Sequence, residues 1–380
     1  MKGDGNMKIR KVIALFCAAI MLTACAENDA DQQQTDSAEA KPVSELYEGY
    51  EELQGNDYEI FTMPEKILPQ GIDKLYTFTR NKRFTVEQEQ NGKRVFKAFW
   101  GKEFDESKCA YSAYDTYYTY NEDGEETGSF DNGSFILQKA GSGRIKDDKA
   151  ITYYSVEQEP DAVIQLAGGS VKTSELAEKT KQFIADCGAD VLYGDFSVEP
   201  MWVTVFDTDK GINASVICAL YYCGVPTDTF TNYYKTGQKD GQMTDTYYIA
   251  PMLTLQFAGP DDLRTARFSS GIRIYDKKEL TSAITLKGAV SLLEKELAEY
   301  SDYDFLSVRL CYCCLLTRPN GEEYADDESK MKELKESLLD IHDEFVPTWC
   351  FYYLTLAGQM ELIKVNAITG EITIDKEQTS

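Results

Sequence analysis

The segment FLSVRLCYCCLL, residues 305–316, has the clearest β-strand pattern in the chain. Apolar side chains recur at every second position, which places them on one face of a pleated strand. These residues are Leu306, Val308, Leu310, Tyr312, Cys314 and Leu316. One such strand buries little surface alone, so the segment predicts a sheet in the C-terminal part of the chain.

The elements around this segment predict a helix packed on antiparallel strands. A helical face precedes it, and an inserted helix, the strand Trp349–Leu354 and a closing hairpin, 362–374, follow. The first helical face contains Ala289, Leu292, Leu293, Leu297 and Tyr300, and the inserted one contains Met331, Leu334, Leu338 and Ile341. An α+β class is therefore expected.

A similar order occurs earlier in the chain. A helix is predicted over 174–187, where Gly188 is the expected stop. Strands are predicted over 201–206, 214–223, 248–257 and 264–275. We therefore expect tandem modules of a helix on an antiparallel sheet, over 161–280 and 281–376.

The segment 46–160 predicts a third, β-rich module. A helix is expected near 84–100, although Asn91-Gly92 interrupts its apolar stripe. Strands are predicted over 111–120 and 134–138, with a hairpin turn at 121–124.

The N-terminus has the pattern of a secretory signal. Lys8, Arg10 and Lys11 precede the apolar run Val12–Met21, which is much shorter than the roughly 20 residues of a membrane-spanning helix. Leu22-Thr23-Ala24-Cys25 then resembles the lipobox of bacterial lipoproteins. The resemblance implies removal of 1–24, acylation of Cys25 (palmitate being the typical acid), and anchoring on the outer face of the cell membrane. An ordinary signal peptide is the alternative. The polar segment 25–45 is expected to be a disordered tether.

Two C-terminal motifs resemble those of known extracytoplasmic modules. Val346-Pro-Thr-Trp349 and Val365-Asn-Ala-Ile-Thr-Gly370-Glu-Ile resemble the ending of PepSY-like modules and YycI-type regulators. Tyr222-Cys-Gly224-Val-Pro226 is similar to a turn in uncharacterised lipoproteins of Gram-positive bacteria. YycI-type proteins restrain a sensor kinase and are held by a transmembrane helix, so the lipid anchor is a departure. The resemblance implies an envelope-protein partner. The motifs themselves suggest positive φ at Asn366 and Gly370, and an anchoring role for Trp349 on a sheet face.

Charge and cysteine content narrow the function classes. The chain has 64 Asp and Glu against 39 Lys and Arg, a net charge of −25, which repels nucleic acid and anionic lipid headgroups. Eight cysteines remain besides Cys17 and Cys25, and most lie in apolar runs. We expect mostly buried, reduced thiols. One or more disulfides remain the alternative.

The sequence contains no complete catalytic motif. His342 is the only histidine and lies near a predicted helix end, where a cation is favoured. Asp207-Thr-Asp209-Lys-Gly211 resembles half of a calcium loop but lacks its later ligands, so a β-turn is expected. We predict no enzyme activity, no metal and no cofactor. A hydrolase using two carboxylates remains an alternative.

Tyrosine offers a possible binding surface. The chain has 25 tyrosines, and Tyr233, Tyr234, Tyr247 and Tyr248 flank the polar segment 235–246, which is predicted to be a mobile loop. Exposed tyrosines stack on sugars or peptides. The expected function is a lipid-anchored, non-catalytic protein that binds or regulates another envelope protein. A carbohydrate- or peptide-binding lipoprotein is the alternative.

Overall fold

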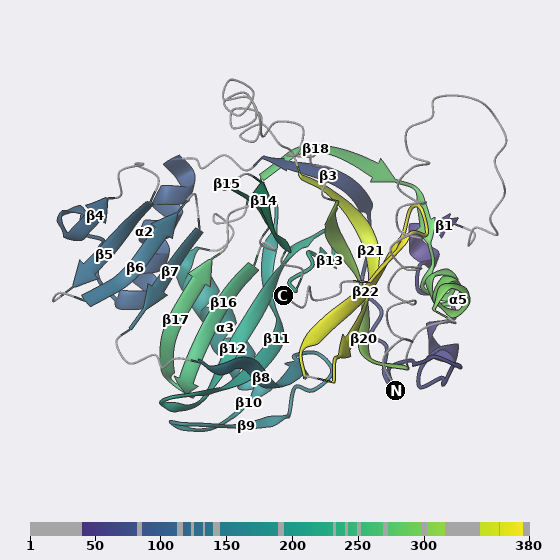
Figure 1. Ribbon diagram of the computed structural model, residues 1–380, viewed down its shortest axis with the longest axis horizontal. Coiled ribbons are helices and arrows are strands. Elements are labelled where there is room, and N and C mark those ends of the chain that lie inside the picture. Colours follow the sequence, from purple (N-terminus) through teal and green to yellow (C-terminus); the bar gives the residue numbers. More distant parts are fainter. Residues whose placement is uncertain are drawn as a thin grey trace, which may run out of the picture. The chain divides into compact units, whose positions relative to one another are not determined.

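The fold is taken from a computed structural model of the full chain. The structure describes residues 40–81, 86–111, 117–122, 125–131, 134–139, 145–188, 194–230, 233–239, 242–248, 252–268, 273–297, 302–315, 343–356 and 358–374. Within these residues most of the ordered chain is β-strand (Figure 1). The expected α+β class is confirmed in this coarse sense, with strands outweighing helices.

The larger sheet is antiparallel and has ten strands. Its order is β4-β5-β6-β7-β17-β16-β12-β11-β8, with β13 paired to β12. The strands are β4 (Cys109–Tyr111), β5 (Tyr117–Glu122), β6 (Glu125–Asp131), β7 (Ser134–Gln138), β8 (Ile145–Ser155), β11 (Ser197–Thr208), β12 (Gly211–Tyr222), β13 (Val225–Pro226), β16 (Met252–Gly259) and β17 (Asp262–Phe268).

The second sheet has seven strands. Its order is β18-β3-β21-β20-β2, with β22 paired to β21 and β23 paired to β22. The strands are β2 (Phe61–Thr62), β3 (Leu75–Asn81), β18 (Arg273–Leu280), β20 (Tyr303–Leu315), β21 (Asp343–Leu354), β22 (Met360–Asn366) and β23 (Ile372–Ile374). Only β2, which runs parallel to β20, breaks the antiparallel pattern.

Three two-stranded sheets complete the described β structure. They pair β1 (Ala40–Pro42) with β19 (Ser282–Ile284), β9 (Val163–Leu166) with β10 (Gly169–Lys172), and β14 (Tyr233–Lys239) with β15 (Gln242–Tyr248). β1 lies inside the segment 25–45, which was predicted to be a disordered tether. The prediction is therefore wrong for residues 40–42, which form a strand. The reason is tertiary: the backbone of 40–42 pairs with β19 whatever its side chains.

The α-helices follow the predicted apolar faces. Within the described residues they are α2 (Val86–Trp100), α3 (Thr173–Cys187) and α5 (Leu286–Glu296). Gly188 ends α3 with φ 67°, as predicted, and Thr285 caps α5 by accepting a hydrogen bond from the Gly288 amide at 3.1 Å. α2 continues through Asn91-Gly92 without interruption, because packing of its apolar face outweighs the low helix propensity of glycine. None of the helices in the described part of the chain is long and apolar enough to cross a membrane.

The predicted strand 264–275 is two strands. β17 ends at Phe268 in the ten-stranded sheet, and β18 begins at Arg273 in the seven-stranded sheet. Strands from 46–160 also lie in both large sheets. Membership of a sheet thus does not follow the predicted boundaries at residues 160 and 280, and the division into modules stays a prediction. The inserted helix at 331–341, the hairpin tip at 123–124 and His342 lie outside the described residues.

Strand β20 is buried on both faces, whereas the sequence predicted one. Val308, Leu310 and Tyr312 belong to the main core, as expected, while Cys311 and Cys313 belong to a second apolar cluster. A bulge between Phe305 and Ser307 leaves Leu306 exposed, against the prediction.

The C-terminal motif has the anchoring role predicted for Trp349. The Trp349 ring is fully buried and packs edge-on against the Tyr47 ring. Its Nε1 donates a hydrogen bond to the Ile284 carbonyl at 2.8 Å. Gly370 has φ 77°, as predicted. Asn366 does not have positive φ; its side-chain oxygen instead accepts from the amides of Ile368 and Thr369, which makes the turn in another way.

Candidate functional site

The second apolar cluster joins the two large sheets. Trp202 of β11 packs on Tyr352 of β21 with ring centroids 5.2 Å apart, and Phe230 packs against both rings. Near this cluster Thr227 forms an isolated parallel bridge with Tyr312. Charged groups placed here are therefore shielded from water by both sheets.

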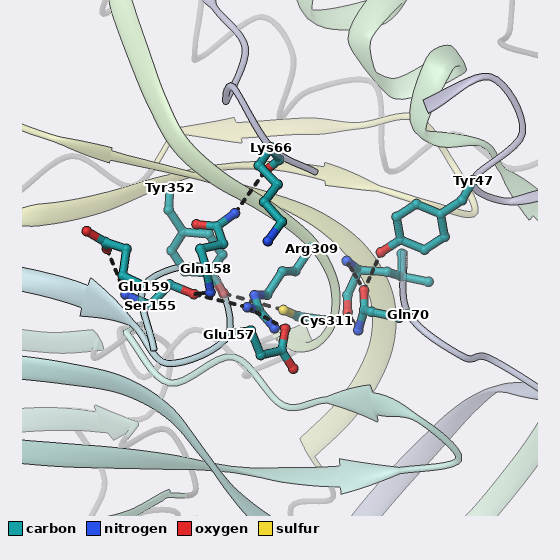
Figure 2. A network of polar contacts seen from close by, with 11 residues as sticks. Tyr47, Lys66, Gln70, Ser155, Glu157, Gln158, Glu159, Arg309, Cys311 and Tyr352 are labelled. Atoms are coloured by element: carbon teal, nitrogen blue, oxygen red, sulfur yellow. Dashed lines mark hydrogen bonds and ion pairs between the residues drawn. The ribbon is translucent and has the colours of Figure 1, made fainter. Parts of the chain in front are cut away.

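Arg309 is the centre of the polar network in this region (Figure 2). It is in the middle of β20, opposite Cys350 of β21, and its side chain is only 4% exposed. Its Nη2 is 2.9 Å from Glu157 Oε2, and it donates to Ser155 Oγ at 3.4 Å. Among the described residues, its buried Nε–H has no hydrogen-bond partner. The guanidinium therefore uses only part of its donor capacity.

The partners of Arg309 come from the end of β8 and the turn after it. Ser155 is the last residue of β8, and its hydroxyl also accepts from the Gln158 amide at 3.4 Å. Glu159 accepts from the Ser155 amide at 3.3 Å. These bonds fix the turn, so that Glu157, half exposed, lies over the guanidinium.

Lys66 approaches the same turn from another segment. Its carbonyl accepts from Gln158 Nε2 at 2.9 Å, and in Figure 2 its side chain extends towards the Arg309–Glu157 pair. The site therefore has a second cation at its rim.

Phenol groups line the site beside Arg309. Burial raises the pKa of Tyr221 and of Tyr352 well above the usual range, although the charge of Arg309 lowers that of Tyr221. Burial acts to lower the pKa of Arg309, but the negative charges that Tyr221, Glu157 and Tyr352 carry when ionised hold it above its usual value. Arg309 is therefore a permanent cation among neutral phenols.

Gln70 binds the backbone of Leu310, the residue that follows Arg309 in β20. Its Nε2 donates to the Leu310 carbonyl at 3.0 Å, and its Oε1 accepts from the Leu310 amide at 2.8 Å and from the Tyr47 hydroxyl (Figure 2). The side-chain amide thus replaces a missing strand partner, which fixes the backbone next to Arg309.

A second charge pair crosses between the sheets. Lys364 Nζ of β22 is 3.3 Å from Asp228 Oδ2, and both side chains are more than nine-tenths buried. Asp228 also accepts from the Phe230 amide at 2.9 Å, and its own amide donates to the Tyr312 carbonyl. These contacts connect the segment after β13 to the seven-stranded sheet.

The eight predicted thiols are all free cysteines in the structure. Cys313 and Cys350 have sulfur atoms 3.5 Å apart. This separation is longer than the roughly 2.0 Å of an S–S bond, so the two thiols are in contact without being bonded. Burial raises the pKa of Cys109 to about 11 and of Cys187 to about 12.

The tyrosines predicted as a ligand site lie on a β-ribbon. Residues 235–246, predicted as a mobile loop, belong to β14 and β15, because their backbones pair with each other. In the register Tyr233 is opposite Tyr248, and Tyr234 is opposite Tyr247. The structure thus brings the four residues together in two cross-strand pairs.

Cys25 lies outside the described residues. Asp207–Gly211 is the tight turn between β11 and β12, as predicted. Within the described ranges, no group of three His, Cys, Asp or Glu residues is arranged to hold a metal ion. Arg309 was not among the predicted site residues, although an arginine at the centre of an apolar strand is a visible signal in the sequence.

No protein-family model and no curated protein matches the chain. Among solved structures, the fold is similar to the crystal structure of an uncharacterized protein from Eubacterium rectale ATCC 33656. The TM-score is 0.53 at 10% sequence identity, and the match covers 84% of this chain and 92% of that chain. At this identity the similarity concerns the fold alone, so no residue role is carried over.

Proposed function

We propose that the chain is a lipid-anchored protein on the outer face of the cell membrane that binds another envelope protein and has no catalytic activity. The anchor would be the acylated Cys25, in the motif Leu22-Thr23-Ala24-Cys25.

The observation that carries the non-catalytic part is the state of the buried nucleophiles. Burial raises the pKa of thiols such as Cys187, Cys218 and Cys350, whereas a nucleophilic thiol needs a lowered pKa. Arg309 and Lys364 are both in ion pairs. These groups favour a scaffold over a reactive centre.

Acylation is tested by growing a Gram-positive host that expresses the full chain with an alkyne fatty acid. We expect label on the wild-type chain and none on Cys25→Ser, which differs at one atom. Labelled chain should fractionate with membranes. A released, unlabelled wild-type chain would contradict the anchor.

Partner binding is tested in the same host with a photo-crosslinking amino acid at Tyr247. Val163 is a suitable control position, since it is exposed and lies on a separate hairpin. We expect a discrete adduct with one membrane protein from Tyr247 only. If neither this position nor others along β14 and β15 form an adduct, a partner at this ribbon is excluded.

The register of the ribbon favours a second candidate, a carbohydrate- or peptide-binding lipoprotein. The backbone register places Tyr233 opposite Tyr248 and Tyr234 opposite Tyr247, and tyrosine is a residue type that stacks on sugar rings or peptides. A glycan array and a peptide library would be probed with the full chain. Binding that is lost in Tyr234→Ala/Tyr247→Ala supports this function, whereas empty screens exclude it.

A further inference from the structure

The least expected group in the interior is the guanidinium of Arg309. A charge transferred from water into a protein interior costs several kcal/mol unless it is paired and fully hydrogen-bonded. Arg309 has one carboxylate and one hydroxyl partner, both on Nη2, and a buried Nε–H without one. Each unsatisfied buried donor in a native fold calls for an explanation, such as a ligand.

The carboxylate that covers Arg309 is on a turn outside the strands. Glu157 is two residues beyond the end of β8 and half exposed, so it can turn away without breaking a strand pairing. Ser155, at the end of the strand, would stay in place. Movement of one side chain thus changes Arg309 from a paired to an available cation.

From this geometry we propose that Arg309 is a receptor for the carboxylate of a small organic acid or of a peptide C-terminus, and that Glu157 occupies it in the absence of ligand. An incoming carboxylate bridges Nη2 and Nε of the guanidinium, which is the side-on fork that arginine offers to planar carboxylates. This satisfies the donor that Glu157 leaves unused.

The surroundings select a carboxylate over a more highly charged anion. Tyr221 and Tyr352 present neutral phenols beside Arg309, and Lys66 extends towards it from the rim. Glu157 and Glu159 remain close by, and the whole chain has a net charge of −25. A dianion such as phosphate would be repelled more strongly than a monoanion.

The test uses the full chain in detergent micelles, titrated with N-acetyl-alanine and followed by calorimetry. Glu157→Gln keeps the shape of the side chain but removes the competing charge. We expect Glu157→Gln to bind N-acetyl-alanine at least about tenfold more tightly than wild type, because the competing state no longer reduces the available fraction. Glu159→Gln is the matched control, since it removes one nearby charge that does not contact Arg309.

Further probes separate the sources of the carboxylate. N-acetyl-alaninamide, which lacks the charge, should not bind. Tighter binding of N-acetyl-trialanine than of N-acetyl-alanine would assign a peptide C-terminus, and equal binding would assign a small acid. Arg309→Lys keeps the charge but not the fork, so a folded variant should lose the tight binding.

Three results would overturn the proposal. The first is equal carboxylate affinity in Glu157→Gln and Glu159→Gln, which would make Arg309–Glu157 a purely structural pair. The second is binding of the amide as strong as that of the acid. The third is phosphate binding as tight as carboxylate binding. The comparison of the two glutamine variants does not need Arg309→Lys to fold, and no outcome depends on a protein partner or an anchor.

Discussion

Replacing each of two buried tryptophans by phenylalanine should reveal what one hydrogen bond contributes to this fold. Trp349 and Trp202 are 0% and 2% exposed, so both substitutions remove a similar indole volume from packed surroundings. They differ in the indole N–H. That of Trp349 donates to the Ile284 carbonyl at 2.8 Å, whereas that of Trp202 has no partner among the described residues.

Trp349→Phe should therefore cost more stability than Trp202→Phe. Both changes leave a partly filled cavity, at about 1–3 kcal/mol for a change smaller than removal of the whole ring. Trp349→Phe also leaves the Ile284 carbonyl without this donor, at about 1–3 kcal/mol, whereas Trp202→Phe removes a donor that was unsatisfied. The expected difference in unfolding free energy is about 2 kcal/mol.

The measurement is urea unfolding of the full chain followed by far-UV circular dichroism, because the substitutions change the fluorescence. The comparison holds where the two variants have equal dependence on urea concentration. A Trp202→Phe variant that is as unstable as Trp349→Phe, or less stable, would refute the reasoning that the Ile284 bond separates the two sites.

Three further predictions concern a turn, a buried charge and the thiols. Gly224→Ala should lower the thermal midpoint by several degrees, since φ is +83° and a Cβ would lie 2.3 Å from the Gly71 carbonyl; Gly194→Ala, with positive φ but open space, is the control for strain alone. Lys364→Met should cost about 3–5 kcal/mol in urea unfolding by removing the ammonium beside buried Asp228, and a cost under about 1 kcal/mol would contradict this. Burial raises the pKa of Cys187 from 9.0 to about 12, so the neutral thiol stabilises the folded state fully below about pH 9. This contribution is lost as pH rises from about 9 towards about 12. In Cys187→Ala the free energy of unfolding, measured over this pH range, should therefore fall less steeply than in the wild type.

Local patterns predicted the elements that depend on neighbouring residues. The apolar face of 174–187 and the stop at Gly188 are examples, because a helix face and its end are encoded within a few turns. The turn Asp207–Gly211 is another. Burial of Trp349 was also predictable, since a large ring in an apolar strand seldom stays exposed.

Features that depend on distant strands were not predicted. The second buried face of β20 exists because β11 and β12 cover it, and an alternating pattern in one strand contains no information on that cover. Arg309 was not predicted as a site for the same reason, because its partners Ser155 and Glu157 are more than 150 residues away in the sequence. The split of 264–275 between two sheets likewise depends on which strands compete for its ends.

The pairing of β1 with β19 has a mechanical consequence. Tension applied to the chain ahead of Ala40 reaches the folded part through three residue pairs, the first of which joins Ala40 to Ile284. The Ile284 carbonyl accepts from Trp349, which is in the middle of β21. A pull on the N-terminal side is thereby shared with the central strands of the seven-stranded sheet, so a force probe attached before residue 40 should record rupture of β1 before that of the sheet.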